Sequence, residues 1–372
     1  MLIFANMQPP KKILITSVII LITIIITKSF SACKTKLIPD QSVKNQIELG
    51  RYLFFDRRLS VNNTRSCGTC HNPQFAFTDG YKRSLGAYAD LHQRNTQPIF
   101  NLALLKYLTA ADSSIHSPLQ QMENPLFNTH TIEMGAAGHE VEILERIKKD
   151  KNYSVLFANA GYQTNWEHIK KAISQFEESI TSLNSRYDKF LKGDTNALSL
   201  GEKNGKQLFF SANLKCATCH GGQNFSTPSI VETSGDTAFY FNIGLYNVDS
   251  RGAYPAYDQG LYEHTKNKTD IGKYRVPTLR NLAFTAPFFH DGSAASLQEV
   301  IENYASGGRN ITDGIYKGNG STNPNKHPFI SGFNITQKDK INLIEFLLCL
   351  SDSNFIKNTT YQNPFEADET KY

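Results

Sequence analysis

The sequence predicts an all-α fold made of two related halves with long irregular loops. Three observations lead to this class. An apolar segment ending in Leu-Phe-Phe occurs twice, at Leu53–Phe55 and Leu208–Phe210, and a Cys-x-x-Cys-His motif follows each copy. The alternation of apolar and polar residues that marks strands is scarce. Residues 227–270 and 307–328 are rich in Gly, Asn, Asp, Ser and Thr, a composition typical of loops.

Helix signals place the elements along the chain. Apolar residues spaced three and four apart predict one amphipathic helix over residues 166–191, ending at Lys192-Gly193-Asp194. Ser199–Glu202 and Ser296–Glu299 match the capping box that begins a helix, and Gly307-Gly308 ends the second of these helices. We therefore expect an N-terminal domain over residues 42–194, a C-terminal domain over 195–352 and a tail over 353–372.

The two Cys-x-x-Cys-His motifs are the most specific chemical signal. They comprise Cys67, Cys70 and His71 in the first half, and Cys216, Cys219 and His220 in the second. This spacing is typical of c-type haem attachment, in which both thiols bond to the porphyrin and the histidine binds the iron. The alternatives are a redox dithiol, which needs no adjacent histidine, and a zinc site, which would have to join distant halves. We adopt two covalently bound c-type haems.

The N-terminus indicates export. Lys11 and Lys12 precede an apolar run over residues 13–27, and small residues then lead to Cys33. Residues 1–33 resemble a bacterial lipoprotein signal in which Cys33 bears the lipid. An uncleaved membrane anchor is the alternative, although the run is short for a span. We expect a protein of the periplasm or cell envelope that a lipid alone holds at the membrane.

The overall charge argues against a nucleic-acid partner. The chain has 39 Lys and Arg against 34 Asp and Glu, and residues 1–33 hold three of the lysines and no acid. The mature chain is therefore close to neutral and has no basic footprint. The remaining cysteine, Cys349, lies in the apolar helix-like stretch Ile341–Leu350, and we expect it to be a small buried hydrophobe.

Beyond the haem motifs, four segments resemble the bacterial di-haem cytochrome c peroxidase and MauG superfamily. They are RNTQP at residues 94–98, the stretch over 121–135 that ends in EMG, RVPTLRN at 275–281 and APFFHDG at 286–292. Residues 125–127 and 242–247 also resemble the MauG-like branch that includes MbnH, which oxidises a tryptophan of a partner protein. The resemblance covers roughly residues 42–352. It implies two cytochrome c-like domains, the N-terminal one meeting peroxide and the C-terminal one transferring electrons.

The resemblance implies a peroxide pocket at the first haem. Glu133 matches the family's distal carboxylate, and Gln121 and Pro125 match positions that line the same pocket. A carboxylate over the iron can take a proton from the near oxygen of peroxide and return one to the far oxygen. On the residues alone, Glu133 is equally a surface glutamate near a helix start.

Some family members close this pocket with a loop histidine. His92 lies in a candidate loop, but its spacing from Asn95 does not fit that role, so we expect it at the surface. His130 and His139 flank Glu133 and receive no role.

The resemblance also implies a sixth ligand for the second haem. Leu297, Val300, Ile301 and Tyr304 share one helical face, so the pattern alone makes Tyr304 a core aromatic. Electron-transfer peroxidases of the family place a Met here, and the MauG-like branch places a Tyr. A thioether raises the haem potential, whereas an anionic phenolate favours higher-valent iron. Tyr304 therefore predicts a second haem of low potential.

Two features of the family lie between the haems. One is a calcium ion, whose matching positions are Asn95 and the backbone carbonyls of Arg275 and Pro277; a structural turn is the alternative. The other is a relay tryptophan, whose position falls here on Ala110. Tyr107 is a nearby substitute, and Trp166 belongs to the amphipathic helix and is expected in the core.

Together these features predict a di-haem peroxidase that uses hydrogen peroxide to oxidise a protein or other electron donor through a high-valent di-haem state. Two alternatives remain. One is a cytochrome c peroxidase that detoxifies peroxide with electrons from a small redox protein, and the other is a non-enzymatic di-haem electron carrier. Tyr304 favours the first function, and Glu133 in its motif argues against the carrier.

Overall fold

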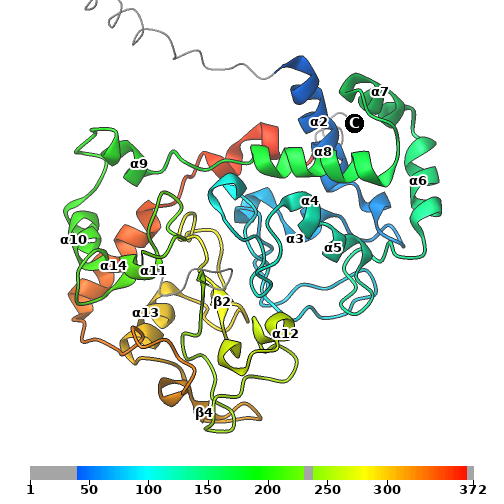
Figure 1. Cartoon of the computed structure of the whole chain (residues 1–372). Helices are drawn as coiled ribbons and strands as arrows, with labels where there is room; N and C mark the ends of the chain where they lie inside the picture. The colour runs from blue at the N-terminus through cyan, green and yellow to red at the C-terminus, as the bar shows by residue number, and fades with distance from the viewer. Residues whose placement is uncertain (1–39, 230–237, 367–372) are drawn as a thin grey trace, which may run out of the picture. The chain divides into compact units, whose positions relative to one another are not determined.

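Each half contains one pair of packed helices (Figure 1). The computed structural model describes residues 40–229 and 238–366. In the first half, α2 (Gln41–Phe55) packs against α8 (Trp166–Ser179). In the second half, α10 (Leu200–Phe209) packs against α14 (Gln337–Cys349). The N-caps of α8, α10 and α14 are Asn165, Ser199 and Thr336, and each side chain accepts a backbone N–H of the first turn.

Each helix pair meets at a glycine. A Cβ atom at Gly50 would collide with the carbonyl oxygen of Ala172, and a Cβ atom at Gly205 would collide with the carbonyl oxygen of Asn342. Backbones can approach this closely only where one of them lacks a side chain. The same requirement therefore holds at the same place in both halves.

The aromatic residues that follow these glycines also repeat their packing. Phe54 meets Phe176 of α8 with ring centroids 5.2 Å apart, and Phe209 meets Phe346 of α14 with centroids 5.3 Å apart. Inclined rings at such distances add to the stabilisation from burial alone. The related halves expected from the sequence therefore share one packing scheme.

A separate apolar core lies in each half. The first joins α2 and α8 to α5 (Glu123–Phe127), α6 (Glu140–Lys148) and α7 (Lys151–Ala160). The second joins α10 and α14 to α9 (Arg186–Leu191) and α13 (Leu297–Ala305). Cys349 is fully buried in the second core, as expected. The one-turn helices α3 (Cys67–Cys70) and α11 (Cys216–Cys219) border the first and second cores, respectively.

Helices make up most of the regular secondary structure, but the fold is not strictly all-α. β1 (Tyr240–Phe241) pairs antiparallel with β2 (Tyr274–Arg275), and β3 (Asn310–Ile311) pairs antiparallel with β4 (Gly318–Asn319). These strands are too short to leave an alternating pattern, which is why the sequence predicted only loops there. The short α12 (Tyr262–Thr265) also lies in the first of those loops.

The single helix expected over residues 166–191 is wrong, because α8 ends at Ser179. Ile180 is extended, and its carbonyl oxygen accepts a hydrogen bond from the backbone N–H of Asn101 at 2.9 Å. The Asn101 side chain also accepts from Ser182 N at 2.8 Å and donates to the Ser182 carbonyl at 3.0 Å. Ser185 then caps α9. These long-range hydrogen bonds outweigh the helical spacing of the apolar residues.

The expected lipoprotein signal, with Cys33, lies outside the described residues, as does the end of the tail. Within residues 40–229 and 238–366, no helix combines the length and apolar character that a membrane span requires.

Candidate haem and peroxide site

In the first motif, one hydrogen bond fixes the histidine ring and leaves its other nitrogen available to bind a metal. α3 carries Cys67 and Cys70 on one turn, and His71 follows as the C-cap residue. His71 Nδ1 lies 2.9 Å from the carbonyl oxygen of Phe77. We assign the ring proton to Nδ1, because this carbonyl can only accept. The Nε2 lone pair is then free for iron, in the arrangement usual for metal-binding histidines.

The second motif repeats this geometry. α11 carries Cys216 and Cys219, and His220 Nδ1 lies 3.1 Å from the carbonyl oxygen of Phe225. Phe225 and its counterpart Phe77 both have a positive φ, at 52° and 63°. This left-handed backbone is uncommon for bulky residues, and here it turns a carbonyl towards each ring.

The thiols fit haem attachment better than the two alternatives. Burial raises the pKa of Cys70 and of Cys219 to about 11 each. A redox dithiol works with a lowered thiol pKa, so the shifts run in the wrong direction for that role. Among the described residues, no group of three or more His, Cys, Asp and Glu could hold a metal ion, which argues against zinc.

Glu133 lies beside the first motif. Burial raises the pKa of Glu133 to about 7. The carboxylate in turn contributes, after burial, to the raised pKa of both Cys67 and Cys70, so it lies within electrostatic range of α3. Its side chain remains 38% exposed, so a small molecule can reach it. A carboxyl group that titrates near neutral pH can both accept and return a proton.

The backbone around Glu133 is fixed on both sides. Met134 N donates to the Pro125 carbonyl at 2.9 Å, and the Met134 carbonyl accepts from Val61 N at 2.9 Å. Pro125 of α5 is thus held next to the Glu133 segment, and its role in the pocket stays a prediction. Gln121 ends the preceding helix, α4 (Pro118–Gln121), and is half-buried. No hydrogen bond joins Gln121 to Glu133 within the described ranges, so its role in the pocket stays a prediction.

His92 is not a surface histidine, so that expectation is wrong. Its side chain is only 14% exposed, and Nδ1 lies 3.9 Å from Glu133 Oε1. The sequence misled because the spacing from Asn95 excludes one ligand position but says nothing about burial. By contrast, His130 is exposed, and His139 lies 3.5 Å from Glu142 at the surface.

Tyr304 lies near the second motif. It is on α13, between a capped start at Ser296 and a left-handed Gly307 with φ of 71°. Burial raises the pKa of Tyr304, with smaller contributions from Cys219 and Cys216. The phenol is therefore close to both thiols of α11. Its role as an iron ligand stays a prediction, as does the expected low potential.

The three residues proposed for calcium have other contacts. Asn95 Nδ2 donates to the Tyr81 carbonyl at 2.8 Å, and Arg275 belongs to β2. The Pro277 backbone partly offsets the fall in the pKa of His220 that burial causes. Calcium at Asn95, Arg275 and Pro277 stays a prediction.

Tyr107 is buried near the loop that follows the second motif. It is 1% exposed and shares a small cavity with Arg275 and with Ser226, which follows the second motif. Arg275 Nη2 donates to Gln97 Oε1 at 2.7 Å. The backbone of Gln97 in turn partly offsets the fall in the pKa of His71 that burial causes. Arg275, rather than Tyr107 itself, thus connects this cavity with the first motif.

The structure shows the contacts of Ala110, at the position expected for the relay tryptophan, and of Trp166. Ala110 accepts a hydrogen bond from the backbone N–H of Arg275 at 2.8 Å. Trp166 packs edge-on against Phe127, with centroids 5.1 Å apart, in the first core, as expected.

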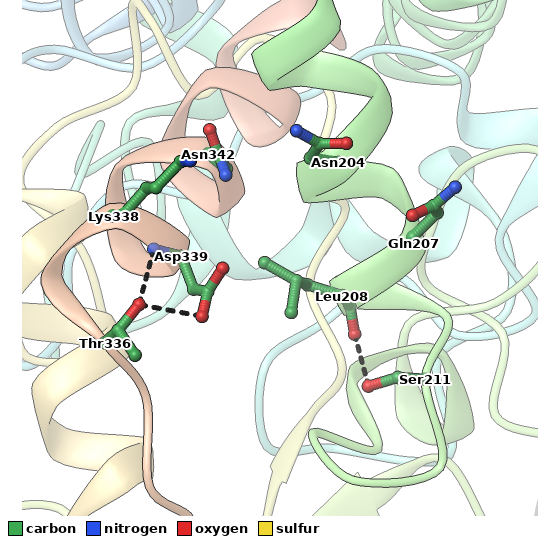
Figure 2. Close-up of a pocket in the computed structure, with 8 residues that line it drawn as sticks. All are labelled: Asn204, Gln207, Leu208, Ser211, Thr336, Lys338, Asp339 and Asn342. Carbon is green, nitrogen blue, oxygen red and sulfur yellow. Dashed lines mark hydrogen bonds between the residues drawn. The ribbon is translucent and has the colours of Figure 1, made fainter.

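A larger surface pocket, of about 430 Å³, lies elsewhere, between α10 and α14. Figure 2 shows its mostly polar lining, which includes Asn204, Gln207 and Asp339. None of the predicted haem or peroxide residues lines it.

Comparisons with known proteins identify the family of the chain. A family model for di-haem cytochrome c peroxidase matches residues 44–196. The cytochrome-c peroxidase IdrP1 of Pseudomonas sp. (strain SCT) is 31% identical, covering 83% of this chain and 81% of its own. The methylamine utilization protein MauG of Methylorubrum extorquens is 30% identical, covering 71% of this chain and 69% of its own.

Solved structures extend the likeness. A MauG-like protein associated with microbial copper homeostasis has a TM-score of 0.83 and 37% identity, covering 87% of this chain and 93% of its own. The diheme peroxidase BthA of Burkholderia thailandensis, at 21% identity and a TM-score of 0.62, supports the fold alone. The resemblance seen in the sequence is confirmed, and the chain belongs to the di-haem cytochrome c peroxidase and MauG family of peroxidases.

Proposed function

We propose that the chain uses hydrogen peroxide to oxidise a protein or other electron donor through a high-valent state shared by two c-type haems. The observation that carries this proposal is the placement of Glu133 beside Cys67 and Cys70, with its pKa raised to about 7. The two haems, once bound through the Cys-x-x-Cys-His motifs, would supply the redox chemistry.

Glu133 supplies the proton handling. Near neutral pH its carboxylate accepts the proton of the peroxide oxygen nearer the iron and returns it to the oxygen that leaves. Pro125 holds this segment through its carbonyl bond to Met134, and Gln121 lies one short helix earlier. A non-enzymatic electron carrier has no use for such a carboxyl group.

Tyr304 decides between the two enzymatic functions. A phenolate from Tyr304 at the second haem would favour retention of oxidising equivalents, as the MauG-like function needs. Peroxide detoxification with a small redox protein is the alternative, and the relative IdrP1 is named a cytochrome-c peroxidase. Tyr107 is our candidate for the relay between the haems, because it is buried and shares a cavity with Ser226, which follows the second motif.

We further propose a calcium ion at Asn95, Arg275 and Pro277, and a location in the periplasm or cell envelope with a lipid on Cys33. The donor is a redox protein or a protein substrate that meets the enzyme transiently.

The kinetic test is peroxide consumption by the fully oxidised enzyme. The proposed function predicts immediate consumption of one equivalent without a reductant. A lag that disappears only after one haem has been reduced would favour the detoxifying peroxidase. Glu133→Gln is the matched variant, because it removes the proton acceptor and leaves both haem motifs intact.

A further inference from the structure

The loop over residues 84–92 is fastened to the Glu133 segment. Leu85 and Leu91 form an antiparallel bridge, and His92 N donates to the Ser84 carbonyl at 2.9 Å. Ala87 N donates to the Glu133 carbonyl at 2.8 Å. Gly86 lies so close that a Cβ there would collide with the Ile132 carbonyl oxygen. The loop and the carboxylate segment therefore hold each other in place.

The His92 ring lies beside the Glu133 side chain. Its Nδ1 lies 3.9 Å from Glu133 Oε1, which is longer than a hydrogen bond but typical of catalytic pairs before substrate binds. Its Nε2 is buried and has no hydrogen-bond partner. Among the described side chains only Asn303 shares this condition. Buried polar atoms nearly always have partners, so an orphaned Nε2 indicates a group that binds there in the working protein.

Four charged or titratable side chains act on the pKa of His92. Burial lowers the pKa of His92, Asp79 and Asp90 act to raise it, and Arg65 and His71 act to lower it further. The net shift is downwards, so the ring is neutral at pH 7. The carboxylate of Asp79 accepts hydrogen bonds from the hydroxyl groups of Ser84 and Thr96 rather than from the His92 ring.

We propose that His92 is a positioning residue for Glu133. Nδ1–H of the neutral ring donates to the Glu133 carboxylate and holds it towards the first motif. The Nε2 lone pair accepts a hydrogen bond from a water molecule held in the pocket. His92 stays neutral throughout, and all proton transfer runs through Glu133. The inference rests on the proposed peroxide chemistry of Glu133, but it does not depend on how the two haems share charge.

The test compares the holoenzyme with His92→Phe, which removes both ring nitrogens, and with His92→Gln, which restores an N–H donor. The control is His130→Gln at an exposed position two residues before Ile132. The rate of reaction with hydrogen peroxide is measured in single turnover against pH, on whichever oxidation state of the enzyme reacts. A requirement for prior reduction would count against the MauG-like function and would leave this measurement intact.

His92→Phe should slow the reaction roughly tenfold, which is less than the loss of 10²–10⁴ typical when an acid–base group itself is removed. It should also move the rising limb of the pH profile to higher pH, because the lost N–H no longer favours the charged carboxylate. His92→Gln should return the limb towards its original position, and His130→Gln should leave it unchanged. In a Glu133→Gln background, His92→Phe should have no further effect.

Three results would overturn the proposal. The first is a uniform loss of rate with an unmoved limb, which would make His92 merely structural. The second is an additional loss in the Glu133→Gln background. The third is a change of the resting ferric spectrum from low-spin to high-spin in His92→Phe, which would make His92 an iron ligand.

Discussion

Arg280 and Asp188 form a two-pronged ion pair that is sealed from solvent. Nη1 lies 2.8 Å from Oδ2, and Nη2 lies 2.8 Å from Oδ1. Burial alone would raise the pKa of Asp188, but the hydrogen bonds from Arg280 and Ser185 lower it below its usual value. Arg280 Nε also donates to the Gln223 carbonyl at 2.8 Å, so the pair ties α9 to the loop that follows the second motif.

Arg280→Met should therefore destabilise the holoprotein by about 3–5 kcal/mol, because it leaves the Asp188 carboxylate buried without its partner. Urea unfolding followed by haem absorbance measures the change. Arg251→Met is the control, since Arg251 is 87% exposed and its contact with Asp249 is at the surface. Equal midpoints for the two variants would contradict the account of the buried pair.

Because Glu177 is buried, we expect the free energy of unfolding to decrease as the pH rises. Its side chain is buried on α8, and burial raises its pKa to about 8, with a smaller contribution from Glu178. The folded state thus holds the proton more tightly than the unfolded state. Stability is highest below the unfolded pKa of about 4.3, and it decreases until the folded pKa is passed.

Glu177→Gln should remove this dependence, with a gain relative to the parent on the order of 5 kcal/mol at pH 8.5 and about 1 kcal/mol at pH 5. Chemical unfolding at both pH values gives the comparison. Glu178→Gln, at the exposed neighbouring position, is the matched control. A Glu177→Gln effect of the same size at both pH values would show that ionisation is not its cause.

Glu133→Gln should lower the rate of peroxide reaction by about 10²–10⁴. In the parent enzyme the rate should rise with pH through about 7, because only the carboxylate can accept the proton. The glutamine variant should lack this limb. Glu145→Gln, on an exposed side chain of α6, controls for loss of charge. Parent-like reactivity of Glu133→Gln would remove Glu133 from the mechanism.

Tyr304→Met should raise the reduction potential of the second haem, because a thioether stabilises ferrous iron relative to a phenolate. A spectroelectrochemical titration of parent and variant reports this directly, and the absorption spectrum of the second haem should change with it. If spectrum and potential both match those of the parent, Tyr304 is a core aromatic rather than a ligand.

Local signals in the sequence predicted local structure well. The helix starts at Ser199 and Ser296 depend on side chains a few residues away, and the structure has both. The repeated Leu-Phe-Phe segments predicted two related halves, and the structure repeats the same aromatic packing in both.

Long-range contacts were beyond prediction from one sequence. The break at Ile180 depends on Asn101, which is remote in the chain, and the spacing of apolar residues could not reveal it. The burial of His92 depends on a loop that packs against Ile132 and Glu133. Glu177 offered one unused signal, since an acid beside Phe176 on the apolar face of a helix is unusual.

The central claim is that both haems share the oxidising equivalents of one peroxide. The most direct test adds one equivalent of hydrogen peroxide to the purified diferric protein without reductant, and follows absorption and electron paramagnetic resonance. The account predicts that both ferric signals are lost together and that a long-lived high-valent species forms. Loss of one ferric signal alone, or no reaction until one haem has been reduced, would contradict it.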